Sequence, residues 1–197
     1  MVDNFDKILD LLEFPSDDCF YFVQLLQRKK EHPELGSNSR LVKCYYIKSK
    51  EYLESLKEEI KGLCRFYNAR AYIHLQYRSF YQCTMQMYKG LTERVLQPDY
   101  THTYHIWDSI CGQFAAGPKR WVVDADNADL ERYGITINEL IWFINSCEHK
   151  VGESIITTLP TKNGYHIITH PFNTKQFGDV YPDIQIQKNN PTVLYID

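Results

Sequence analysis

The sequence predicts a mixed α+β fold, and three observations lead to this fold class. Runs rich in β-branched and aromatic residues alternate with stretches that have the spacing of amphipathic helices. The last third of the chain holds several such runs separated by short turns, which favours antiparallel strands near the C-terminus. Hydrophobic residues make up 44% of the chain and charged residues 24%, the balance expected of a domain that buries its own core.

The length of 197 residues suits a single domain, and no repeat, low-complexity tract or long linker divides the chain. Residues 1–97 predict an N-terminal α/β part that contains a β-α-β unit. Residues 119–197 hold the motifs that carry chemistry. We therefore expect one domain over residues 1–197 with these two parts.

Charge and cysteine usage restrict the class of protein. The net charge of −3 argues against a uniformly basic nucleic-acid coat and leaves local basic tracts open. The six cysteines form no C-x-x-C pair, and the first residues lack the features of a targeting segment. No run approaches the ~18 apolar residues of a membrane-spanning helix. We expect a protein of the reducing cytoplasm that does not enter a membrane.

The first elements are a helix, a strand and a charged loop. Apolar spacing predicts a short helix over 4–13, which the polar turn at 15–18 ends. Residues 19–26 are aromatic and β-branched enough for a strand. Residues 28–39 are typical of a loop, and the three basic residues 28–30 are interpreted as a solvated turn.

A β-α-β unit is expected over residues 41–77. Residues 41–47 and 69–77 predict strands, and Ser49 is placed to cap the helix between them. That helix carries one apolar stripe, formed by Leu53, Leu56, Ile60 and Leu63. A further helix is expected over 79–96.

The second half begins with a segment, 98–119, that shows no clear pattern. Residues 120–126 predict a strand. Thr136 and Glu139 have the spacing of a capping box and open an apolar helix. Four later segments predict strands: 154–158, 164–170, 183–187 and 192–196.

The D-x-D pair at the end of the strand over 120–126 is the first candidate for chemistry. Successive side chains of a strand alternate between its faces, so Asp124 and Asp126 share a face and lie about 7 Å apart along it. Trp121, Val123 and Ala125 point to the other face, into a core. Two carboxylates on one face repel each other unless a cation lies between them, and hard oxygen ligands select Mg²⁺ or Mn²⁺. The alternative is a strand end that enters a polar turn.

A Gly-containing turn that leads into a strand is the second candidate. It includes Thr161, Lys162 and Gly164, and His166 follows on the strand. Backbone N–H groups in such a turn can hold phosphate oxygens, and Lys162 adds a positive charge. The alternative is an ordinary hairpin turn with an incidental histidine.

Asp183 is the third candidate, because it opens an alternating strand. An aspartate at a strand start is normally a turn residue, so this position indicates little by itself. The order of the three elements indicates more. His166 follows Asp126 by 40 residues and precedes Asp183 by 17.

This order resembles the archaeo-eukaryotic primase superfamily, the primase-polymerases. The similar segments are the apolar strand ending in D-x-D at 121–126, the small-residue turn ending in histidine at 161–166, and the aspartate-led strand at 183–187 followed by a turn and another strand. The serine of the family's turn is absent, and Thr161 or the residues after it stand in its place.

The resemblance implies an RRM-like core and metal-dependent nucleotidyl transfer on a nucleic-acid template, in primer synthesis or extension. Asp124, Asp126 and Asp183 would be catalytic and would bind Mg²⁺ or Mn²⁺. The nucleotide's phosphates would be held by His166, Lys162, Gly164 and Thr161. The implied partners are nucleoside triphosphates, single-stranded DNA or a primer-template, and a helicase or replication protein.

Two alternatives remain. A ligase-type nucleotidyltransferase would use Lys162 as its nucleophile, but that class has one more residue between the lysine and the Asn-Gly pair. A catalytically inactive module that binds nucleic acid or protein would use aromatic side chains and five basic residues, Arg65, Arg70, Arg78, Lys119 and Arg120. Convergence of three carboxylates favours the enzyme, since a binder of polyanions gains nothing from them.

Overall fold

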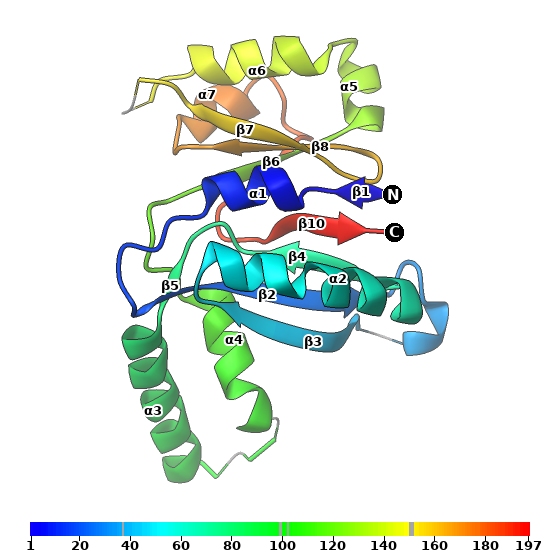
Figure 1. Cartoon of the computed structure of the whole chain (residues 1–197). Helices are drawn as coiled ribbons and strands as arrows, with labels where there is room; N and C mark the ends of the chain where they lie inside the picture. Colours follow the sequence, from blue (N-terminus) through cyan, green and yellow to red (C-terminus); the bar gives the residue numbers. More distant parts are fainter. Residues whose placement is uncertain (37, 99, 102, 150–151) are drawn as a thin grey trace.

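The computed structural model describes residues 1–36, 38–98, 100–101, 103–149 and 152–197. It contains two antiparallel sheets with helices packed on them (Figure 1). Helices account for 41% and strands for 28% of the chain, so the expected mixed α+β class is confirmed. The helices of the described part of the chain lack the length and apolar character that crossing a membrane requires.

The first sheet is built mainly from the N-terminal half. In spatial order it contains β1 (Val2–Asp3), β10 (Thr192–Ile196), β4 (Arg70–Ile73), β2 (Cys19–Gln27) and β3 (Arg40–Ile47), with β5 (Arg78–Ser79) paired to the start of β2. Side chains of β2 alternate between two cores. Its odd-numbered residues, such as Val23, pack with α1 (Phe5–Leu11) and α2 (Lys50–Tyr67). Its even-numbered residues, such as Phe22, pack with α3 (Phe80–Leu96) and α4 (Ile106–Gln113).

The expected β-α-β unit is present in a modified form. Strands β3 and β4 flank α2, and Ser49 caps that helix by accepting a hydrogen bond from the Tyr52 N–H. The two strands are not neighbours, because β2 lies between them and is antiparallel to both. The prediction of one strand over 69–77 was wrong, since β4 ends at Ile73 and the separate strand β5 follows.

The second sheet belongs to the C-terminal half. In spatial order it contains β7 (Ile155–Pro160), β8 (Gly164–Thr169), β6 (Trp121–Asp126) and β9 (Gln185–Gln187). One face is covered by α5 (Asn127–Tyr133), α6 (Ile137–Ser146) and α7 (Thr174–Gly178), which lie above it in Figure 1. The capping box of Thr136 and Glu139 is present at the start of α6, as predicted.

The last two strands separate into different sheets. Strand β9 pairs with β6, whereas β10 crosses to the first sheet and pairs with β1 and β4. The prediction of a strand that starts at Asp183 was wrong, because residues 182–184 form a turn and β9 begins at Gln185. The two sheets share a core, since Val122 and Ile168 of the second sheet pack with the interior of the first.

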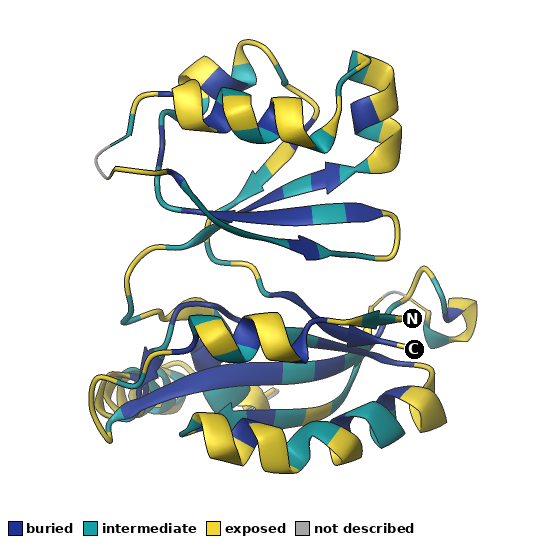
Figure 2. Cartoon of the chain, turned by 45° about the horizontal axis from the view of Figure 1, so that its top comes forward, coloured by how far each residue is buried: buried dark blue, intermediate teal, exposed yellow. Residues whose placement is uncertain are grey.

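Three short helices had no counterpart in the sequence analysis, namely α4, α5 and α7. Two short 3₁₀ helices, Pro33–Leu35 and Thr103–His105, lie in segments that were expected to be irregular or had no clear pattern. Burial follows the layers: Figure 2 shows buried strands between helices whose outer faces are exposed. The core that contains Val122, Ile168 and the interior of the first sheet contacts both sheets, so residues of the two sheets lie close together.

Candidate functional site

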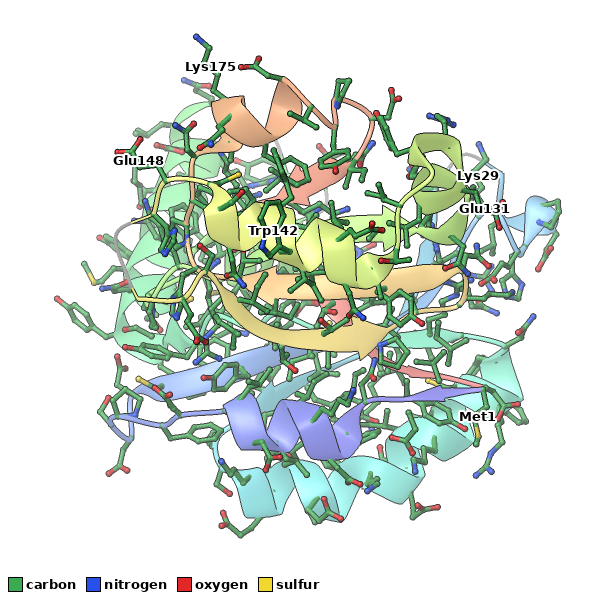
Figure 3. The ribbon with its side chains drawn as sticks, turned by 90° about the horizontal axis from the view of Figure 1, so that it is seen from above. Met1, Lys29, Glu131, Trp142, Glu148 and Lys175 are labelled. Carbon is green, nitrogen blue, oxygen red and sulfur yellow. The ribbon has the colours of Figure 1, made fainter. Side chains whose placement is uncertain are left out.

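A cavity of about 690 Å³ lies where the two sheets meet. One wall comes from β6, β8 and the turn before β9. The other comes from the ends of β2, β4 and β10 with the segment after β2, and the β7–β8 turn reaches this wall through Lys162, which bonds to Glu31. Figure 3 views the molecule from above and shows Lys29 of that segment and Glu131 of α5 on the same side. All but one of the site residues implied by the resemblance line this cavity: Asp124, Asp126, Asp183, His166, Lys162 and Thr161. The exception is Gly164, which follows the lining residues 161–163 in the sequence.

Asp124 and Asp126 form the acidic wall. Strand alternation places both in the cavity, and Val123 and Ala125 are buried on the opposite face against the helices, as predicted. Burial raises the pKa of Asp126, and the neighbouring charges of Asp124 and Asp129 raise it further. Asp129, in the first turn of α5, is thus a further carboxylate at this wall.

His166 lies directly opposite Asp124 in the sheet. Its side chain is only 10% exposed, and Nε2 lies 3.4 Å from Oδ1 of Asp124. Nδ1 lies 2.8 Å from the hydroxyl oxygen of Thr192 on β10. Both ring nitrogens therefore have partners, and the histidine links the second sheet to the first while it orients Asp124.

Gly164 permits the close approach of the β7–β8 hairpin to β6. It lies opposite Asp126, and a Cβ atom at this position would lie 2.2 Å from the carbonyl oxygen of Ala125. The Thr161 N–H donates to the Gly164 carbonyl, which closes the turn over 161–163. The Asn127 N–H donates to Asn163 at 2.9 Å, so the turn rests against the start of α5.

Asp183 lines the same cavity but has other partners. The Tyr133 hydroxyl donates to Oδ2 of Asp183 at 2.9 Å, and Nη1 of Arg132 lies 3.2 Å from the same oxygen. These contacts hold the pKa of Asp183 below its usual range. The β6–β9 register, which pairs Asp124 with Gln185, would place Asp183 opposite Asp126 if β9 continued by two residues.

The donor set fits a hard divalent cation only in part. Asp124 and Asp126 offer carboxylate oxygens from one face of a strand, which suits Mg²⁺ or Mn²⁺. Asp183 turns toward Arg132 and Tyr133. Within the described ranges, no three histidine, cysteine or acidic side chains are grouped closely enough to hold a metal ion.

The opposite wall is basic. Arg28 and Lys30 line it. Lys29 and Lys30 are exposed residues of a turn, as expected for this segment, and Arg28 is half-buried. Arg70 and Lys162 also line it, and Glu31 bonds to both. The hydrogen bond from Arg70 is the main reason that the pKa of Glu31 falls to about 2, and Lys162 contributes to the same shift.

The floor of the cavity is mixed. Leu26, Tyr72 and Val193 contribute side chains from the open face of the first sheet. Gln185 and Gln187 face them from β9, and the Gln187 amide lies 3.5 Å from Oδ2 of Asp124. The sequence analysis assigned none of these residues to the site, although the alternation of 184–187 does place both glutamines on the face of Asp183.

Two of the five basic residues proposed for a pure binding module, Arg78 and Arg120, are committed to contacts inside the fold. Arg78 is fully buried and donates to backbone carbonyls, including that of Cys111. Arg70 is bonded to Glu31, and Arg120 donates to the Leu11 carbonyl with its side chain 9% exposed. Two of the five, Arg65 and Lys119, are exposed.

Comparison of the chain with protein-family models, with curated proteins and with solved structures gives no match. The geometry of the cavity is therefore the basis for proposing a function.

Proposed function

We propose that the chain is a metal-dependent nucleotidyltransferase of the primase-polymerase type that acts on a nucleic-acid template. The observation that carries the proposal is the distribution of charge in one cavity. Asp124 and Asp126 line one wall, and Arg28, Arg70 and Lys162 line the other. A nucleoside triphosphate with its cation needs both, because its phosphates bridge cation-binding carboxylates and basic side chains.

The shape of the cavity also suits a nucleotide. Its volume of about 690 Å³ lies within the range of roughly 300–1,000 Å³ that is typical of small-molecule sites. The floor formed by Leu26, Tyr72 and Val193 offers apolar and aromatic surface to a base, which stacks readily on such groups.

The three aspartates and His166 each have a role in the proposal. Asp124 and Asp126 hold the cation, and His166 orients Asp124. Mg²⁺ or Mn²⁺ bound there would neutralise charge on the attacking and leaving oxygens. His166 then exchanges its contact with Asp124 for a phosphate oxygen. Asp183 would join the other two carboxylates once Arg132 and Tyr133 release it.

The β7–β8 turn, a nucleic-acid substrate and a partner protein complete the proposed activity. Thr161 and Lys162, in the turn that Gly164 closes, contact the phosphates. The order of the D-x-D strand, the Gly-containing turn and the aspartate before β9 supports membership in the archaeo-eukaryotic primase superfamily. Single-stranded DNA or a primer-template would be the second substrate, and a helicase or replication protein the partner. Lys162 contacts Glu31 at 2.8 Å, an ion pair that disfavours a role as nucleophile.

The test measures incorporation of labelled NTPs or dNTPs on a single-stranded template, with and without primer, in Mg²⁺ or Mn²⁺. The double variant Asp124→Asn/Asp126→Asn keeps the size of both side chains and removes their charge. We expect its activity to fall by at least a factor of about 100, the scale seen when a group that stabilises transition-state charge is removed. The control is Asp10→Asn/Asp17→Asn, which removes two charges at exposed positions outside the cavity.

Activity that needs divalent metal and disappears only in the Asp124/Asp126 variant supports the proposal. Activity that survives in this variant contradicts the assigned roles.

A catalytically inactive nucleotide-binding module is the second candidate. The observation that favours it is the engagement of Asp183 by Arg132 and Tyr133, which leaves Asp124 and Asp126 without the third carboxylate of the proposed metal site. This candidate predicts binding of nucleotides without incorporation under any metal condition.

A further inference from the structure

Glu31 occupies the basic wall of the cavity like a bound anion. Its carboxylate accepts two hydrogen bonds from the guanidinium of Arg70, from Nε at 2.9 Å and from Nη2. The ammonium of Lys162 donates to the same carboxylate at 2.8 Å. A guanidinium fork together with an ammonium is also the donor set that recognises phosphate oxygens.

Arg70 is built into the fold as a fixed donor. It lies on β4 with its side chain 9% exposed, whereas Lys162 lies at the tip of the β7–β8 hairpin with its side chain 56% exposed. The two cations come from different sheets and meet only at the carboxylate of Glu31. A buried guanidinium needs an anionic partner, because an unpaired buried charge is costly.

The segment that carries Glu31 is anchored without it. Nε2 of His32 lies 2.7 Å from the Asn68 carbonyl oxygen, and the His32 N–H donates to the Arg28 carbonyl. The side chain of Glu31 is 22% exposed and lines the cavity. Another anion can therefore replace the Glu31 carboxylate by rotation of the Glu31 side chain alone, while the two contacts of His32 stay in place.

We infer that Arg70 and Lys162 form a receiving site for the phosphate chain of a nucleotide, and that Glu31 is an internal counter-ion that fills this site until the nucleotide displaces it. The inference rests on the proposed function for the identity of the ligand. On exchange, phosphate oxygens take over the fork of Arg70 and the ammonium of Lys162. The carboxylate of Glu31 turns to solvent, and Arg28 and Lys30, which line the same wall, remain open to the phosphate chain.

This exchange gives the site selectivity by charge. A ligand with a single negative charge only replaces the carboxylate that is already present and gains little. A polyphosphate brings several charges and also reaches Arg28 and Lys30, so it can outcompete Glu31. The site is therefore expected to favour triphosphates over monophosphates.

The probe is inorganic tripolyphosphate, titrated into the full-length protein by calorimetry in the presence of a chelator, so that neither metal nor base contributes. Glu31→Gln removes the competing charge and is expected to bind at least about tenfold more tightly than the native chain. Lys162→Gln in that background is expected to lose most of the gain. Glu131→Gln is the control, since it removes a charge at an exposed position of α5 outside the cavity, and it should stay within about twofold of the native chain.

Weaker or unchanged binding in a folded Glu31→Gln variant would overturn the inference and leave Glu31 with a purely structural role. If Glu31→Gln does not fold by circular dichroism, Glu31→Asp supplies the same test. Its shorter side chain keeps the charge but cannot contact both cations as Glu31 does, so affinity should rise by a smaller factor. No rise in a folded Glu31→Asp variant would equally count against the inference.

The experiment separates the inference from the proposed function. Tripolyphosphate binding needs no divalent cation, so the Asp124→Asn/Asp126→Asn variant should bind the probe at least as tightly as the native chain. The expected affinities without any nucleotide incorporation would support the receiving site and reject the catalytic proposal. Incorporation together with an unchanged affinity of Glu31→Gln would support catalysis and reject the role of Glu31.

Discussion

At the scale of single residues, Glu31 links stability to pH. Its pKa of about 2 lies below the ordinary value of 4.5, because Arg70 and Lys162 stabilise the charged form. A carboxylate with a depressed pKa stabilises the folded state above its unfolded pKa, and this contribution is lost as pH falls through the folded pKa. The stabilisation should therefore be complete above about pH 5 and disappear between about pH 4.5 and pH 2.

The matching measurement is urea unfolding of the native chain and Glu31→Gln at several pH values. We expect the variant to be less stable by about 1–3 kcal/mol near neutral pH, the scale of hydrogen bonds to a charged group. The difference should shrink as pH falls below about 4.5. Glu131→Gln, at an exposed site on α5 (Figure 3), should show a small difference at every pH. A difference for Glu31→Gln that does not change with pH would contradict this assignment.

The sequence could predict site residues whose placement follows from local rules. Asp124 and Asp126 share a face because strand alternation is a local property, and Val123 and Ala125 turn away for the same reason. No local sequence pattern indicates that Glu31 belongs to the site. It meets Lys162 across 131 positions of sequence, so only the assembled sheets bring the two side chains together.

At the scale of elements, the β7–β8 hairpin depends on Gly164. A methyl group there would lie 2.2 Å from the Ala125 oxygen and 2.8 Å from Cα of Asp126, and both are backbone atoms that cannot rotate away. We expect Gly164→Ala to destabilise the fold by about 1–3 kcal/mol or more, as overpacking does. Urea unfolding measures the change.

Gly62→Ala is the control for that substitution. Gly62 lies within α2, and nothing lies within 4 Å of an added Cβ atom. Alanine is the better helix former there by roughly 0.5–1 kcal/mol, so this variant should be more stable than the native chain. If the two substitutions changed stability equally, the backbone around Gly164 would have to move to accommodate the methyl group, contrary to this expectation.

Elements were predictable from sequence where they are long or capped. Helix α2 carries a full apolar stripe, and α6 begins with a capping box. Helix α5 has only seven residues, too few to show a period, although Gly134 in left-handed conformation marks its end. This omission affected the site, because α5 supplies the two residues that hold Asp183.

At the scale of the whole molecule, β10 joins the two halves of the chain. It lies between β1 and β4, all five of its residues are buried, and Leu194 and Tyr195 belong to the shared core. The Asn4 side chain donates to the carbonyls of Val193 and Pro160, which ties β10 to the end of β7. Sequence patterns predicted the strand but not its sheet, because alternation does not specify a partner.

A truncation and a circular permutation test this role of β10. A chain that ends at Asn190 lacks five buried residues. At about 1.5–3 kcal/mol for each large apolar side chain, the loss is on the order of 10 kcal/mol. That is comparable to the whole stability of a typical domain, so the truncated chain should show no cooperative unfolding transition.

The permuted chain begins at Pro191, continues to Asp197, and joins Met1 through a Gly/Ser linker of roughly four residues, the length of a short hairpin loop. The register of β1 with β10 pairs Val2 with Ile196, and Figure 1 shows the two termini side by side, so the linker is long enough. This chain restores β10 at the other end of the sequence and should unfold in one cooperative transition, measured by circular dichroism in urea. A folded truncated chain would show that β10 is dispensable for folding. An unfolded permuted chain would show that β10 acts through its covalent connection to β9 and not only through its place in the first sheet.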